Sequence, residues 1–106
     1  MDMYRQGDVL IIRCEINDEP AGHQLPLEGG RVILAHGEAT GHAHAIPGED
    51  AALYAANDGA AYRHLRVLRP TALRHEEHGP ISLRPGLYRV IRQREYSPEE
   101  IRYVLD

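Results

Sequence analysis

Two short segments of the sequence bring together four of its seven histidines. Residues 41–44 read GHAH and contain His42 and His44, and residues 75–78 read HEEH and contain His75 and His78. Residues two apart on an extended strand point to the same face, with about 7 Å between their Cβ atoms, so the first pair can converge on one bound group. Neutral imidazole is the commonest metal ligand in proteins. The two segments predict one shared site for a metal ion or for acid–base chemistry.

The spacing within the second segment limits the chemistry of that site. The zinc-protease motif places two histidines four apart on one helical face, whereas His75 and His78 are three apart, so a metalloprotease helix is excluded. In a tight turn the two rings can come together. Three or four ligands from the four histidines and one glutamate would suit Zn, Mn, Ni or Fe(II). Three protein ligands would leave a position open for water or substrate.

Two functions fit these residues, and the first is a hydrolase acting on a small or phosphate-containing substrate. Glu76 or Glu77 would act as the general base, with a metal ion or, without one, in acid–base partnership with the histidines. Arg92 or Arg94 would stabilise developing negative charge, and Tyr96 would orient the substrate. Nothing in the sequence indicates an organic redox cofactor.

The second function is a non-catalytic module that binds a partner protein or serves a larger complex. The small barrel would then use its histidine rim to bind the partner. The arrangement of the four histidines separates the two functions. Catalysis requires them to converge in one concave pocket beside an arginine, whereas a binding module can leave them scattered.

Residues 37–49 resemble the first motif of the cupins, in which a glycine precedes a His-x-His pair that a glutamate follows. Gly37, His42, His44 and Glu49 stand in that order. The resemblance implies that His42, His44 and Glu49 ligate a divalent metal inside a small β-barrel. The second cupin motif is altered, because Arg89 occupies the position of its histidine. By this resemblance the fourth ligand would come from the HEEH segment.

A second resemblance extends over most of the chain. The segments GEATGHAHAI, HEEHGPI and QREY are similar to those of a group of short, uncharacterised bacterial proteins. This resemblance implies no activity.

Composition places the chain among ordinary globular proteins. Its 106 residues, of which 42% are hydrophobic and 26% charged, predict a single domain over residues 1–106. No segment approaches the roughly 20 apolar residues that cross a bilayer, and the first residues lack a secretory pattern. Cys14 is the single cysteine, which excludes an internal disulfide. We expect a cytoplasmic protein, and its net charge of −4 makes general nucleic-acid binding an unfavourable function.

Short β-branched stretches separated by Gly and Pro predict an all-β or mainly β domain. About seven to eight short strands would form a small β-barrel or sandwich. The predicted strands cover residues 9–16, 31–36, 42–46, 51–56, 61–68, 71–74, 81–83 and 87–96, and residues 17–30 are predicted as a loop. Residues 97–106 fit either a short helix beginning at Ser97 or a turn followed by a strand over 101–105.

Overall fold

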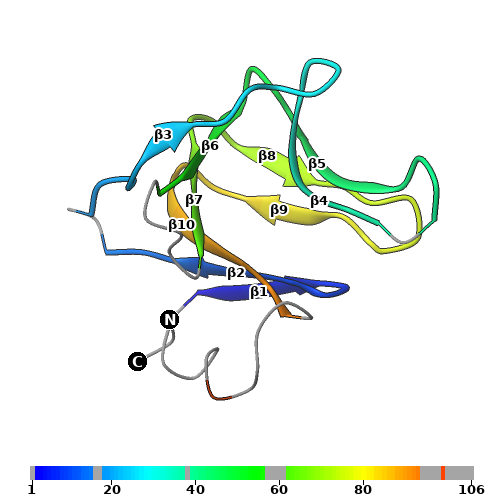
Figure 1. Cartoon of the computed structure of the whole chain (residues 1–106). Coiled ribbons are helices and arrows are strands. Elements are labelled where there is room, and N and C mark those ends of the chain that lie inside the picture. The colour runs from blue at the N-terminus through cyan, green and yellow to red at the C-terminus, as the bar shows by residue number, and fades with distance from the viewer. Residues whose placement is uncertain (1, 16–17, 38, 57–61, 94–98, 100–106) are drawn as a thin grey trace.

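The computed structural model describes residues 2–15, 18–37, 39–56, 62–93 and 99. Strands form most of the regular structure in these residues. Figure 1 shows the strands in chain order. The ten strands of these residues are β1 (Met3–Gln6), β2 (Val9–Arg13), β3 (His23–Gln24), β4 (Arg31–His36), β5 (Ala43–Pro47), β6 (Ala51–Ala55), β7 (Arg63–Val67), β8 (Thr71–Leu73), β9 (Ile81–Leu83) and β10 (Gly86–Arg92). The all-β prediction is confirmed.

The described strands form one large sheet and two small ones. The large sheet is antiparallel, with the strand order β1-β2-β10-β7-β6-β3. The antiparallel pairs β4–β5 and β8–β9 form the small sheets. Within the described residues β1 and β3 remain edge strands, so the sheet does not close into the barrel that was one of the two predicted architectures.

The main hydrophobic core cluster joins the large sheet to both small ones. Its buried side chains come from β2, β6, β7 and β10 on one side and from β4, β5, β8 and β9 on the other. Ile11, Leu34, Leu73 and Tyr88 are among the fully buried members. Burial of apolar area from all three sheets fixes β5 and the β8–β9 hairpin relative to β1 and β2. This layered arrangement positions the histidine segments.

Eight of the ten strands correspond to predicted segments. The two exceptions are β1, which was not predicted, and β3, which lies within the predicted loop 17–30. The strand predicted to end at Tyr96 is described as far as Arg92, and Tyr96 itself lies outside the described residues. Both predictions for residues 97–106 also fall outside the part of the chain that the structure describes, apart from residue 99. No helix in that part is long and apolar enough to cross a membrane.

A two-residue turn connects β1 to β2 and carries Asp8 toward the small sheets. Gln6 pairs with Val9, so Gly7 and Asp8 are the central residues of the turn. Gly7 has a φ of 59°. Among the described residues only glycines have a positive φ, so Asp8 at the second central position does not. A positive φ at the first central position is the pattern of a type II′ turn, whose twist matches that of the flanking strands.

We predict that Leu65→Ala lowers the free energy of unfolding by about 2–5 kcal/mol, because it leaves a cavity in the core. Leu65 has no exposed surface and pairs with Leu53 on β6 and Tyr88 on β10. Urea unfolding followed by circular dichroism measures the change. Leu68→Ala is the matched control, because Leu68 is 57% exposed and its truncation should cost less than about 0.5 kcal/mol. Equal losses in the two variants would contradict the assigned core.

Candidate functional site

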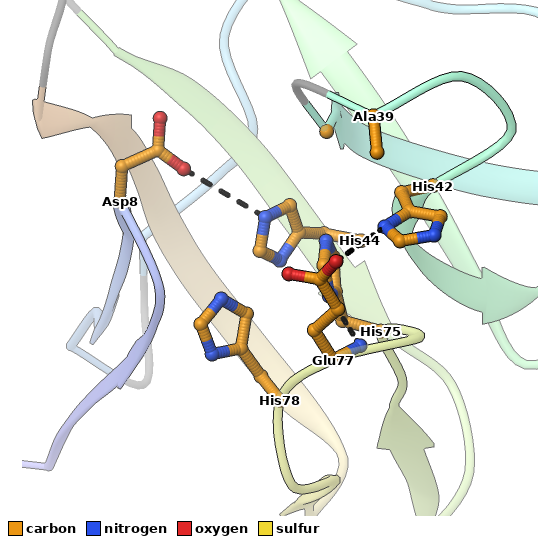
Figure 2. A pocket seen from close by; sticks show the side chains of 8 residues that line it. Asp8, Ala39, His42, His44, His75, Glu77 and His78 are labelled. Atoms are coloured by element: carbon orange, nitrogen blue, oxygen red, sulfur yellow. Dashed lines mark hydrogen bonds and ion pairs between the residues drawn. The ribbon is translucent and has the colours of Figure 1, made fainter.

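All four histidines of the GHAH and HEEH segments lie around one pocket of about 350 Å³ (Figure 2). His42 directly precedes β5 and His44 is its second residue, and His75 and His78 lie in the loop between β8 and β9. The ring centroid of His75 is 4.3 Å from that of His44, 4.7 Å from that of His78 and 5.7 Å from that of His42. His75 is therefore the central ring of the cluster. Two pairs distant in sequence converge as expected.

Backbone pairing brings the two segments together. The N–H of Ala45 donates to the carbonyl of Arg74, and the N–H of Arg74 donates to the carbonyl of Ala45, each at 2.9 Å. These residues adjoin His44 and His75. The Ala43 N–H donates to Oε1 of Glu76 at 2.8 Å, which adds a side-chain contact between the same segments.

Gln6 determines how His44 faces the pocket. The Gln6 side-chain NH₂ donates to the carbonyls of Leu73 and Gly79, each at 3.0 Å, so its Oε1 is the atom that lies 2.9 Å from Nδ1 of His44. An amide oxygen only accepts hydrogen bonds, and Nδ1 of His44 must therefore carry the hydrogen. In the neutral ring this leaves the lone pair on Nε2, which faces Asp8 Oδ1 at 3.7 Å.

Burial keeps the His44 ring neutral. His44 is 2% exposed, and burial, followed by the proximity of His75, lowers its pKa from 6.5 to about 4. Asp8 opposes this shift with a smaller effect. At neutral pH the ring is therefore an uncharged donor with its free lone pair at Nε2.

Three carboxylates surround the rings, and each has a different role. Oδ1 of Asp8 faces His44, while its Oδ2 accepts a hydrogen bond from Nε of Arg92 at 3.2 Å. Oε1 of Glu77 lies 3.3 Å from Nδ1 of His42, and Glu77 lines the pocket. The backbone hydrogen bond from Ala43 lowers the pKa of Glu76, whose carboxylate thus connects the two segments.

Two glycines allow the rings to approach the backbone. A Cβ added at Gly37 would lie 2.8 Å from Cβ of His42 and 3.1 Å from Nε2 of His75. A Cβ added at Gly7 would lie 2.8 Å from Nε2 of His78. Real Cβ atoms require more space than this, so a larger residue at either position would displace the histidines.

The structure places the other predicted site residues as follows. Arg94 and Tyr96 lie outside the described residues. Arg92 contacts the pocket through Asp8, and its Nη2 donates to the carbonyl of His36 at 2.6 Å. Glu49, a ligand implied by the cupin resemblance, is exposed in the turn beyond the far end of β5 and does not line the pocket. The cupin ligand set therefore does not form here.

The histidines outside the two segments do not line the pocket. His36 is exposed and pairs with Glu28 at 3.0 Å, and His23 is exposed on β3. His64 is buried, and its Nδ1 accepts a hydrogen bond from the N–H of Ala21 at 3.2 Å. Substitutions of these three histidines can therefore serve as controls for substitutions in the pocket.

Sequence reasoning missed Asp8 and Gln6. A signal for Asp8 was present, since Gly-Asp before a β-branched run is a hairpin turn and places an acidic side chain at its tip. No local signal indicates Gln6, because its partners Leu73 and Gly79 are 67 and 73 residues away.

The fold and the site define a small antiparallel β protein with a histidine-lined pocket. The chain belongs to the family described as Domain of unknown function (DUF8820), whose sequence profile matches residues 5–93. This agrees with the predicted membership in a group of uncharacterised short proteins. The matched region contains the four histidines, Asp8 and Gln6. Neither the curated proteins nor the solved structures contain a match.

We predict that metal-free protein loses stability as the pH falls from about 6.5 to 4, in part through His44. In this range the unfolded chain binds a proton at His44 that the folded chain does not, so unfolding becomes easier. The shift corresponds to about 3 kcal/mol. His44→Gln should therefore show a shallower dependence of unfolding free energy on pH, measured by urea unfolding with chelator present. His36→Gln, at an exposed ring, should keep the original dependence, and parallel curves for all three proteins would contradict the assignment.

Proposed function

We propose that the protein binds a divalent transition-metal ion, of the class Zn, Mn, Ni or Fe(II), in the histidine pocket. The observation that carries this proposal is the Gln6–His44 hydrogen bond, which leaves Nε2 of a buried neutral imidazole turned toward the pocket. Metal-binding histidines characteristically donate their second ring N–H to an oxygen acceptor that fixes the ring. A buried histidine that served only packing would have no need of a lone pair facing a polar pocket.

The spacing of the donor atoms supports an ion of this class. One ligand atom from each of His42, His75 and Glu76 lies within 4.8 Å of the other two. Bonds of about 2.0–2.2 Å to one ion require ligand atoms no more than about 4.4 Å apart, so small side-chain movements suffice. Imidazole nitrogens favour transition metals over Mg²⁺ or Ca²⁺, which prefer oxygen.

One hydrogen bond must open when His75 binds an ion. Its Nδ1 accepts the N–H of Glu77 at 3.0 Å. If Nε2 takes the ion, Nδ1 of the neutral ring carries the hydrogen and cannot accept; if Nδ1 takes the ion, its lone pair is used. Binding at His75 is therefore coupled to a small movement at Glu77.

We predict that chain loaded with Zn²⁺ and then dialysed retains the ion, and that the double variant His42→Ala with His44→Ala does not. The variant removes His42 from the group of three ligand atoms that lie closest together and removes the buried His44 ring that Gln6 orients, so the pocket loses the two donors on which the proposal rests. Elemental analysis measures the ion content of each protein, with Mn, Ni and Fe(II) tested in the same way.

The matched control is the double variant His23→Ala with His36→Ala. It removes the same number of imidazoles from exposed positions outside the pocket and should retain the ion. Absence of all four metals from the parent chain after loading would overturn the proposal. Equal retention by both double variants would mean that the ion binds to another part of the chain.

Hydrolysis of a small or phosphate-containing substrate is the activity that such a site supports best. A bound divalent ion would lower the pKa of a water molecule toward neutrality. The Glu77 side chain is 64% exposed and faces the pocket beside His42, so it can accept a proton from a water molecule there. Arg92 holds Asp8 in place from outside the rings. Convergence of the histidines favours this activity over a binding module with scattered rings.

We predict that metal-loaded protein hydrolyses bis(p-nitrophenyl) phosphate and that Glu77→Gln slows the reaction by about 10²–10⁴-fold, the usual contribution of a general base. Release of nitrophenol measures the rate, and elemental analysis checks that the variant keeps its ion. Glu19→Gln is the control, at a glutamate whose side chain is 85% exposed and lies outside the pocket. Full activity in Glu77→Gln would exclude this glutamate as the base, and inactivity of the loaded parent chain would exclude phosphodiester hydrolysis.

A further inference from the structure

Gln6 connects the large sheet to the histidine pocket. It is the last residue of β1, its backbone pairs with Val9 of β2, and it is buried. Its side-chain NH₂ donates to the carbonyls of Leu73 and Gly79, on the two sides of the HEEH segment. The reversed amide would place its oxygen against these two carbonyl oxygens, so the orientation with Oε1 toward His44 is the one that satisfies the amide.

Two acceptors face the ring of His44, and a neutral imidazole has only one N–H to donate. Oε1 of Gln6 lies 2.9 Å from Nδ1, whereas Oδ1 of Asp8 lies 3.7 Å from Nε2. The first separation is that of a hydrogen bond, and the second is longer than one. The ring hydrogen is therefore on Nδ1, and Nε2 keeps its lone pair.

Asp8 would compete for this hydrogen if Gln6 did not accept it. Without an acceptor at position 6, a hydrogen on Nδ1 of His44 would be a buried donor with no partner, which is unfavourable. A hydrogen on Nε2 would instead point toward the Asp8 carboxylate, and a hydrogen bond to a charged acceptor is stronger than one to a neutral acceptor. In that tautomer Nε2 would have no lone pair to offer an ion.

An amide at position 6 also suits the charge of the pocket. With neutral imidazoles, the carboxylates of Asp8, Glu76 and Glu77 contribute three negative charges. Arg92, which donates to Asp8, contributes one positive charge. The sum is two negative charges, which one divalent ion would balance. The Gln6 amide accepts the hydrogen of His44 without changing this sum.

We infer that Gln6 is a positioning residue of the proposed metal site, which keeps the ring hydrogen of His44 on Nδ1 and so prevents Asp8 from drawing it to Nε2. This inference rests on the proposed metal binding and adds the residue that keeps one ligand atom available. Partners of this kind contribute about 10–100-fold to metal affinity. Gln6 therefore acts on the ion through His44 and does not touch it.

Nuclear magnetic resonance of the unaltered chain tests the position of the hydrogen directly. Long-range proton–nitrogen spectra at pH 7 without metal should show His44 protonated at Nδ1 and unprotonated at Nε2, with His44→Gln identifying the signals. Addition of Zn²⁺ should shift the Nε2 signal and leave Nδ1 protonated. A hydrogen on Nε2 in the metal-free chain would overturn the inference and leave metal binding intact. Failure to bind Zn²⁺ would overturn the proposed function and the inference with it.

Gln6→Met removes the amide and keeps a side chain of similar length. We expect the hydrogen of His44 to move to Nε2 and the dissociation constant for Zn²⁺, measured by isothermal titration calorimetry, to rise by about 10–100-fold. Gln24→Met is the matched control, because Gln24 is exposed on β3 and should change neither quantity. An unchanged tautomer or an unchanged affinity in Gln6→Met would contradict the assigned role.

Gln6→Glu separates the effect on the ring from the support of the loop. A glutamate keeps an acceptor for Nδ1 of His44 but lacks the NH₂ that donates to Leu73 and Gly79. We expect this variant to lose stability, to keep the hydrogen on Nδ1 and to bind Zn²⁺ more tightly than Gln6→Met does. Equal affinities of the two variants would mean that Gln6 only supports the loop, and would overturn the inference.

Discussion

The backbone bridge between Ala45 and Arg74 is the contact on which the pocket depends. Its two hydrogen bonds join β5 to the residue after β8, and His44 and His75 are the next residues of the two segments, on the same side of the bridge. The hydrophobic core packs both small sheets against the large one, and the bridge sets their register along the chain. A slip of one residue would turn His44 to the opposite face of its strand. Strand register thus determines which residues face the pocket, and side-chain contacts then set the orientation of the individual rings.

Burial of Gln6 and His44 is the second constraint, and it acts through hydrogen bonding. Both residues are 2% exposed, and an unpaired polar group at such positions would cost about 1–3 kcal/mol. Every polar atom of the Gln6 side chain has a partner: its NH₂ donates to Leu73 and Gly79, on the two sides of the HEEH segment, and its Oε1 accepts from His44 on β5. One amide therefore holds the loop and selects the protonated nitrogen of His44. A satisfied network of this kind favours a single arrangement over its alternatives.

Much of the strand pattern could be predicted from the sequence, because β-branched runs such as those of β2 and β4 have few other stable conformations. β1 was missed because Met3–Gln6 contains no β-branched residue and its pairing with β2 is set by the Gly7–Asp8 turn. The number of strands did not distinguish a barrel from layered sheets, since closure depends on whether the edge strands pair. The four histidines could be found from their spacing. The different orientations of Glu76 and Glu77 could not, because the loop bends and Ala43 supplies the partner of Glu76.

The arrangement of the rings is the main physical support for the proposal that a cation binds in the pocket. Imidazoles 4.3–4.7 Å apart repel one another when protonated, and His75 already lowers the pKa of His44. The neutral His44 ring presents a lone pair at Nε2, and the Asp8 carboxylate that faces it only accepts hydrogen bonds and cannot donate one. A bound cation would accept this lone pair and would at the same time be attracted to Asp8, Glu76 and Glu77. The same burial that neutralises His44 thus supports the proposed binding of a cation.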